Sequence, residues 1–238
     1  MTTPGAEQAQ GAIAARAERL RRAIAQRAKP GVRTLSEHDS LGVLELAGIE
    51  VVRFAYAPSL ETLGVAARTV GYPLVLKGMM AAVAHKTEKG LVHPWIRSEP
   101  ELLAAARALP EGCEGFLLEE QVRGIRELVL GIVRDPSFGA SVLVALGGVH
   151  SELLADTSFA LAPVCAADAR AALSRLRCRR MLDAYRGEAP ADLDRLVAMM
   201  QQLGELALAA PAIRELDINP VILRRDGVPV ACSGLVVL

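Results

Sequence analysis

A group of cationic side chains around one histidine is the feature of this chain most suited to chemistry. Lys77 ends the apolar run Pro73–Lys77, which is typical of a buried strand whose last residue emerges as a cation. His85, Lys86 and Lys89 follow in a short polar segment. Lysine ammonium groups bind phosphate oxygens as point charges, and neutral imidazole is a nucleophile able to carry a phosphoryl group. The alternative is a solvated basic loop in which the histidine has no role.

A second candidate site is the segment Glu215–Pro220, whose alternation of polar and apolar residues predicts a strand. Side chains alternate along a strand, so Glu215, Asp217 and Asn219 share one face while the intervening leucine and isoleucine face the core. Three oxygen-bearing side chains on one face suit a hard cation such as Mg2+, shared with substrate phosphates. The alternative is an ordinary amphipathic strand with one solvated face.

Two shorter motifs supply further candidates. Gly147 and Gly148 follow an apolar strand, and paired glycines let backbone amides approach an anion. Glu119 and Glu120 end another apolar run before a predicted turn at Gly124, where a carboxylate can accept ribose hydroxyls. The alternatives are a plain turn for the glycines and a surface acidic pair for the glutamates.

Composition excludes several classes of function. Lysine plus arginine equals aspartate plus glutamate, 27 each, so no overall field favours nucleic acid or an anionic membrane. The four cysteines show no CxxC spacing, which argues against a zinc site or a disulfide framework. The start lacks the pattern of a signal peptide, and no apolar run approaches the roughly 20 residues of a membrane span. We therefore expect a cytoplasmic protein.

Helices and strands are expected to mix without strict alternation, which favours α+β with antiparallel sheets over a doubly wound sheet. Helices are expected at about 36–47, 62–70, 99–108, 166–176 and 192–208, and strands at about 49–54, 73–77, 90–96, 116–120, 127–134 and 141–146, with a C-terminal hairpin of 213–224 and 228–238. Residues 1–32 are expected to form a helical arm, with its helix over 11–28. Because its apolar stripe is narrow and alanine-rich, we expect the arm to be mobile or to pack on a partner.

Taken together, the motifs resemble one family over about residues 33–238. The segments that occur in the family's order are Leu35–Glu37, Ala47–Ile49, Pro73–Lys77, His85–Glu88, Glu127–Asp135, Phe138–Gly139, Gly147–Gly148, Leu161–Pro163, Tyr185–Gly187 and Glu215–Pro220. They resemble the ATP-grasp domain of ADP-forming acyl-CoA synthetases, in the β subunit of the acetate–CoA ligase type, which is related to succinyl-CoA synthetase. The resemblance implies two α+β lobes that clamp a nucleotide, a small lobe at about 50–118 and the rest of 33–238 as the second.

The resemblance also implies a division of labour between two chains. A partner α subunit would carry the CoA and carboxylic acid sites and a phosphorylated histidine, and this β subunit would exchange the phosphoryl group with ATP and ADP. Lys77 and Lys86 would hold the nucleotide phosphates, and His85 would relay the phosphoryl group. Positive charge and Mg2+ matter because phosphoryl transfer depends chiefly on positioning and charge stabilisation.

The remaining site residues follow from the same resemblance. Glu120 and Glu127 would line the nucleotide cleft, and Asn219 would bind magnesium, with Asp217 as a further candidate ligand. One departure concerns the metal. The family has an aspartate on the strand opposite Asn219, but the predicted hairpin places residues 232–234 there, and Ser233 offers only a hydroxyl. We therefore weigh an active ligase subunit against a catalytically weakened ATP-grasp module that acts as a binding or scaffold subunit, or another ATP-grasp ligase chemistry.

Overall fold

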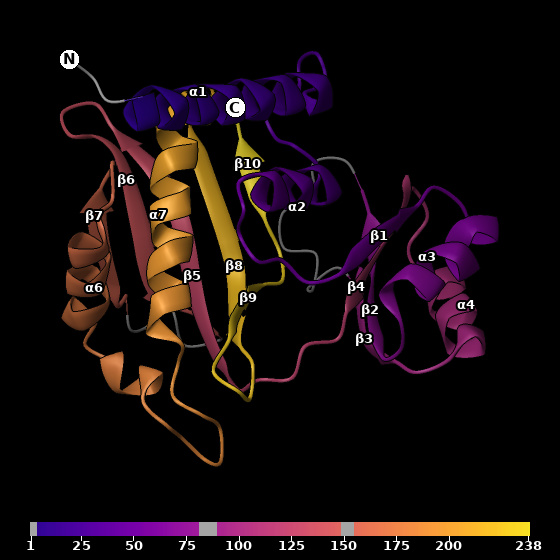
Figure 1. Ribbon diagram of the computed structural model, residues 1–238. Coiled ribbons are helices and arrows are strands. Elements are labelled where there is room, and N and C mark those ends of the chain that lie inside the picture. Colours follow the sequence, from indigo (N-terminus) through magenta and orange to yellow (C-terminus); the bar gives the residue numbers. More distant parts are fainter. Residues whose placement is uncertain (1–3, 81–89, 149–154) are drawn as a thin grey trace. The chain divides into compact units, whose positions relative to one another are not determined.

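The computed structural model describes residues 4–80, 90–148 and 155–238, with side chains from residue 14 onward (Figure 1). The chain divides into two compact units. Unit 1 comprises Met1–Leu35, Asp39–Glu50 and Gly124–Leu238, and unit 2 comprises Ser36–His38 and Val51–Arg123. The elements of each unit mix helices with an antiparallel sheet, so the predicted α+β class is confirmed.

Unit 2 is built on a four-stranded antiparallel sheet in the order β1-β4-β2-β3. Its elements are β1 (Phe54–Ala57), η1 (Leu60–Thr62), α3 (Leu63–Val70), β2 (Leu74–Met79), β3 (Val92–Ile96), α4 (Glu99–Ala108) and β4 (Gly115–Glu120). The helices α3 and α4 pack on the sheet. Their apolar side chains, among them Leu63 and Leu102, bury Leu74 and Leu76 of β2 in one core cluster. Consequently the alternate residues of β2, including Lys77, belong to the other face of the sheet.

Unit 1 is built on a larger antiparallel sheet in the order β10-β8-β5-β6-β7, with β9 also paired to β8. Its elements are α1 (Pro4–Arg27), α2 (Glu37–Leu46, whose first residues count with unit 2), β5 (Arg126–Asp135), β6 (Gly139–Leu146), β7 (Thr157–Leu161), α6 (Ala166–Arg175), η2 (Arg179–Leu182), α7 (Leu193–Ala209), β8 (Glu215–Leu223), β9 (Pro229–Ala231) and β10 (Leu235–Val237). Helix α7 packs across β5 and β6 and contacts α6 and α1.

Both ends of α7 are satisfied by side chains, which fixes this long helix on the sheet. Asp192 is the N-cap, and its carboxylate accepts a hydrogen bond from the backbone N–H of Arg195 at 3.0 Å. At the other end Arg134 of β5 donates from Nη2 to the carbonyl oxygens of Ala207 at 2.6 Å and Ala210 at 3.3 Å. These carbonyls lack helical partners, so the half-buried arginine replaces the hydrogen bonds that the helix end cannot make.

The N-terminal helix differs from the predicted arm. It spans Pro4–Arg27, and Leu20 and Ile24 are almost fully buried. The helix packs on α7 of the same unit, and Arg16 Nη1 donates to Glu205 Oε2 at 2.9 Å. The expectation that this segment buries little within its own chain was wrong, because its narrow stripe meets a complementary helix. The proposed domain bounds of 1–32 and 33–238 stay a prediction.

Three strand assignments also change. The first strand begins at Phe54, not at residue 49, and β7 was not predicted at all. The predicted final strand, 228–238, is divided into β9 and β10 by residues 232–234. Gly234 lies against α2 there, since a Cβ at Gly234 would lie 3.0 Å from Leu44 Cδ1.

Candidate functional site

Lys77 lies in a buried network of charges in unit 2. Its Nζ lies 2.7 Å from Glu37 Oε1 and 2.7 Å from Glu119 Oε2. Glu119 is on β4, opposite Val75 of β2, so it is a diagonal neighbour of Lys77 on the same face of the sheet. The predicted lysine is therefore not an exposed cation at a strand exit. It is enclosed by two carboxylates.

The electrostatic balance keeps Lys77 charged. Burial lowers the pKa of the Lys77 amine, but the carboxylates of Glu119 and Glu37 outweigh burial and hold the pKa above its ordinary value. A buried charge without such partners would be too costly to maintain. The result is a cationic group within β2, fixed in one position by two hydrogen-bonded acids.

Glu37 is a residue of this network to which sequence reasoning gave no role. It stands at the start of α2, 40 positions before Lys77. The only sequence signal was its place in the segment Leu35–Glu37, which matches the family order. A pairing across that separation depends on tertiary packing and cannot be read from local periodicity.

The two adjacent glutamates of β4 have different environments. Glu119 is buried beside Lys77, whereas Glu120 is half-buried and its Oε2 lies 3.1 Å from Arg53 Nε. The backbone N–H of Glu120 also donates to the carbonyl of Arg53 at 2.8 Å. Neighbouring strand residues point to opposite faces, so the dipeptide is not a surface acidic pair. Glu120 is the member placed at the more accessible face.

Three predicted residues meet in unit 1, at the start of β5 and the end of β6. The backbone N–H of Gly147 donates to the carbonyl of Glu127 at 2.8 Å. A Cβ on Gly147 would lie 2.9 Å from the carbonyl carbon of Glu127, and Gly148 has a φ of 83°. Both glycines are thus required by the backbone. They allow the main chain to approach the backbone of Glu127 closely.

The C-terminal motif lies on β8 as the alternation predicts. Leu216 and Ile218 are buried, Asp217 is half-buried and Asn219 is exposed. Burial, with the nearby charge of Glu215, raises the pKa of the Asp217 carboxyl. A protonated carboxyl is a poor cation ligand. Because its pKa is raised, Asp217 should bind a metal more weakly as the pH falls.

A β-bulge shapes this part of β8. Leu128 of β5 pairs with Val221, but Leu130 pairs with Ile218, so β8 holds one residue more than β5 between these pairs. The additional residue lies at Asn219–Pro220. Bulges re-aim side chains and occur often beside active sites.

The register of β8 with β9 and β10 places Ser233, in the segment between the two short strands, opposite Asn219. Asp217 pairs with Leu235, and Val221 pairs with Ala231, so the register is the same on both sides and places Ser233 opposite Asn219. The backbone N–H of Cys232 donates to the carbonyl of Pro220 at 3.0 Å and continues this pairing. The stretch predicted to lie opposite Asn219 therefore does so, and it contributes a hydroxyl without a carboxylate.

A metal at this face would need oxygens beyond those of the protein. Over residues 4–80, 90–148 and 155–238, no group of three or more His, Cys, Asp or Glu side chains could hold an ion. Asp217 and Asn219 offer a carboxylate and an amide oxygen, which suit a hard cation that takes its other ligands from phosphates and water. The donor set fits a nucleotide-bound Mg2+, but not an isolated metal site.

The predicted site residues fall into two groups. Lys77, Glu119 and Glu120 belong to unit 2, whereas Glu127, the glycine pair and the β8 residues belong to unit 1. His85 and Lys86 lie outside the described residues. Among the described residues, no helix has the length and apolar character needed to cross a membrane.

Comparisons with known proteins show the family of this chain. A family model described as an ATP-grasp domain matches residues 26–237. The β subunit of ADP-forming acetate–CoA ligase I from Pyrococcus furiosus is 32% identical over 214 residues, covering 86% of this chain and 92% of that protein. The chain therefore belongs to the ATP-grasp domain family, and within it to the β subunits of ADP-forming acetate–CoA ligases.

Two further relatives are informative. The ADP-forming acetate–CoA ligase I of Archaeoglobus fulgidus is 34% identical over 79% of this chain, which spans only 29% of that longer protein. The structure of the Candidatus Korarchaeum cryptofilum acetyl-coenzyme A synthetase 1 with coenzyme A and Mg-AMPPCP is 30% identical, with a TM-score of 0.82 and coverage of 92% of this chain and 99% of that chain. In that structure, a phosphohistidine segment points towards the nucleotide-binding site.

Proposed function

We propose that this chain is the nucleotide-binding β subunit of an ADP-forming carboxylate–CoA ligase. It exchanges a phosphoryl group between ATP or ADP and a partner α subunit, by way of a histidine. The observation that carries the proposal is the buried, charged Lys77 on β2, 2.7 Å from each of two carboxylates, within a chain that matches a whole β subunit along 92% of its length. Nucleotide phosphates bind fixed cations, and here they would compete with Glu37 and Glu119 for the Lys77 ammonium.

The side chains take the following roles in the proposal. Lys77 and Lys86 bind the phosphates, and His85 relays the phosphoryl group. On the unit 2 side, the carboxylates of Glu119 and Glu120 lie where β4 ends. Glu119 orients Lys77, and Glu120 accepts nucleoside hydroxyls.

Unit 1 supplies the remaining contacts. Gly148 presents its backbone amide to the phosphates, and Gly147 holds this turn against Glu127 through its own N–H. Asp217 and Asn219 hold Mg2+, which neutralises phosphate charge during transfer. Because only one carboxylate and one amide are offered on β8, the nucleotide completes the coordination.

The partner is a CoA-binding α subunit carried on a separate chain. The Pyrococcus relative is named as a β subunit, so we assign CoA and acid recognition to a second protein. We place the assembly in the cytoplasm, since the cysteines at 113, 165, 178 and 232 are all free thiols.

The test is co-purification of the chain with its partner from the native cell, followed by an activity assay of the complex. The tagged chain is purified with its companions, a CoA-binding subunit is identified by mass spectrometry, and the complex is screened for ADP and acyl-CoA formation over short and dicarboxylic acids. We expect activity from the complex and none from the chain alone. Acyl-CoA formation by the chain free of any other subunit would overturn the two-chain proposal.

One observation favours a second candidate, a binding or scaffold subunit without catalysis. Ser233 stands opposite Asn219 where the family has an acid, so metal binding is weakened. A co-purified complex that binds MgATP but forms no ADP with any acid would support this candidate.

A further inference from the structure

The segment between α6 and α7 carries an unusual concentration of positive charge. Residues 177–187 contain four arginines and one acid, Asp183, although the whole chain has equal numbers of basic and acidic residues. We call residues 177–187 the arginine loop. In Figure 1 it is the orange segment before α7, and it extends past the end of the sheet of unit 1. Its charge is therefore a local property that the net charge conceals.

The start of the arginine loop is held by a buried carboxylate. Asp156 Oδ1 accepts from the backbone N–H of Arg177 at 2.8 Å, and Oδ2 accepts from that of Cys178 at 2.7 Å. Burial alone raises the pKa of the Asp156 carboxyl, but these two hydrogen bonds outweigh it and lower the pKa below its usual value. The charged form of Asp156 thus fixes the backbone of the loop.

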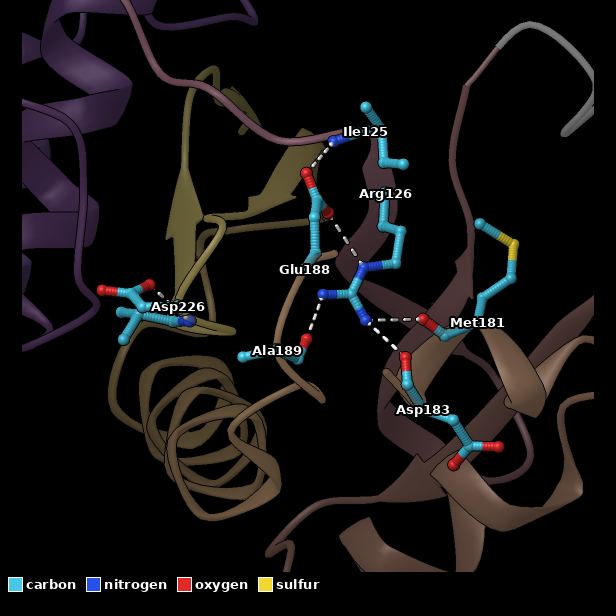
Figure 2. A network of polar contacts seen from close by, with 8 residues as sticks. Ile125, Arg126, Met181, Asp183, Glu188, Ala189 and Asp226 are labelled. Atoms are coloured by element: carbon cyan, nitrogen blue, oxygen red, sulfur yellow. Dashed lines mark hydrogen bonds and ion pairs between the residues drawn. The ribbon is translucent and has the colours of Figure 1, made fainter. Parts of the chain in front are cut away.

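The middle of the loop is held by Arg126, which is 1% exposed (Figure 2). Its Nη1 donates to the carbonyl oxygens of Met181 at 3.1 Å and Asp183 at 2.8 Å. Its Nη2 donates to the carbonyl of Ala189 at 2.5 Å. Because the Arg126 guanidinium donates to three backbone carbonyls, it fixes the backbone path of residues 181–189.

Glu188 completes this anchor. Its Oε2 lies 3.3 Å from Arg126 Nε, and its Oε1 accepts from the backbone N–H of Ile125 at 3.2 Å (Figure 2). The loop is also bonded to the turn after β8, where the N–H of Ala189 donates to the carbonyl of Arg225 at 2.9 Å. The loop is therefore pre-organised, and little conformational entropy remains to be lost on binding.

The tip of the loop presents an arginine and a tyrosine outward. Tyr185 and Glu188 exchange backbone hydrogen bonds of 3.2 and 3.0 Å around Arg186 and Gly187, whose φ angles are 47° and 83°. Two positive φ values define the tight hairpin turn, which is unusual for an arginine. The guanidinium carbon of Arg186 lies 5.2 Å from the centre of the Tyr185 ring, which is 49% exposed.

We propose that the arginine loop is a docking surface for a carboxylate-rich segment of the CoA-binding partner subunit. This inference rests on the proposed function. Arg179, Arg180 and Arg186 are exposed, and within the described part of the chain no carboxylate pairs with any of them. Arginine is the preferred cation for ion pairs at interfaces, because its planar fork binds carboxylates in a bidentate manner.

The shape of the loop favours a protein partner over a small anion. Small ligands bind in concave sites, whereas the tip around Tyr185 and Arg186 is a two-residue turn. Tyrosine and arginine are the residue types that contribute most to binding at protein interfaces.

The experiment uses the full chain and the CoA-binding subunit identified by co-purification. Binding is measured by calorimetry for the wild type, Arg179→Glu/Arg180→Glu and Arg186→Asn, since asparagine tolerates the left-handed backbone of position 186. The control is Arg68→Glu/Arg107→Glu, which reverses the same number of charges on exposed positions of α3 and α4. Titration of each isolated chain with MgADP reports the nucleotide site separately.

We expect both loop variants to raise the Kd for the partner about tenfold or more, to reduce its salt dependence, and to leave MgADP binding unchanged. The control should bind the partner as the wild type does. Partner binding equal in the loop variants and the wild type would overturn this inference alone. Loss of affinity for MgADP or CoA, with partner binding intact, would show that the loop binds phosphate. If no CoA-binding subunit is found, both the proposed function and this inference fail.

Discussion

Ser233, between β9 and β10, lies opposite Asn219 of β8 and offers a hydroxyl at the magnesium site that we propose. The bulge at Asn219–Pro220 leaves the asparagine exposed beside the half-buried Asp217. Any Mg2+ at this face therefore depends on the phosphates for much of its coordination, and this dependence can be measured.

Restoring the acid should tighten binding of the metal–nucleotide complex. Ser233→Asp should improve MgATP affinity by about 1–3 kcal/mol, the range for one charge-assisted contact. Ser233→Ala should change little. Calorimetric titration with and without Mg2+ measures both effects, and the gain should vanish when Mg2+ is omitted. Unchanged MgATP binding in Ser233→Asp would mean that these strands do not face the metal.

Removing the Lys77 amine should destabilise the protein. Lys77→Met leaves Glu37 and Glu119 buried together without a cation, which costs about 3–5 kcal/mol. Glu37→Gln should cost less, because the pair with Glu119 is retained. The measurement is urea unfolding of the three proteins near neutral pH. Equal stability of Lys77→Met and the wild type would contradict a buried, charged network.

The pH dependence of this network follows from the raised pKa of Lys77. A group whose pKa is higher in the folded state stabilises the protein fully below its unfolded pKa, and this contribution is lost as pH rises through the folded value. Because the ordinary value is already 10.5, the contribution of Lys77 should stay constant across the neutral range and decline only in strong alkali. Unfolding curves from neutral pH upward would show it.

Asp156 should govern part of the acid sensitivity of unit 1. Its folded pKa lies below the usual 3.8, so its stabilising contribution is present above that value and is lost as pH falls through the folded pKa. Asp156→Asn should cost about 1–3 kcal/mol near neutral pH, since one of two backbone N–H groups loses its acceptor. The difference from the wild type should shrink in acid. A difference independent of pH would exclude the titration of this carboxyl as the cause.

The ion pair of Arg126 and Glu188 should behave as a coupled unit. Arg126→Met leaves a glutamate that is 7% exposed without its cation and should cost about 3–5 kcal/mol. The double variant Arg126→Met/Glu188→Leu should recover part of that loss, because an apolar pair carries no desolvation cost. Recovery stays partial, since the carbonyls of Met181 and Asp183 lose their donor. Additive losses in the double-mutant cycle would show that the two side chains are not coupled.

Local patterns predicted much of the fold. Period-2 alternation located β8, with Asp217 and Asn219 on one face, and glycine pairs correctly indicated close backbone approach at Gly147. β1 was misplaced by several residues because Val52 is buried in an irregular segment without a ladder partner. Burial and strand pairing are different properties, and hydrophobicity reports only the first.

The candidate site was predicted less completely, for a physical reason. Lys77 was found as a strand-end cation, but its enclosure by Glu37 comes from a contact 40 positions away. The pair of Arg126 and Glu188 is 62 positions apart. Long-range ion pairs have no periodic signature, since they depend on which elements become neighbours in space.

The bulge at Asn219–Pro220 also restricts how this gene can change length. Leu216 and Ile218 are buried before it, and Val221 and Leu223 after it, so the buried positions switch from even to odd numbers. Loss of one codon here would turn the second half of β8 inside out and expose its core residues. Surface turns elsewhere tolerate insertions and deletions during evolution. At this point of β8, by contrast, adding or removing a single residue reverses which side chains face the core.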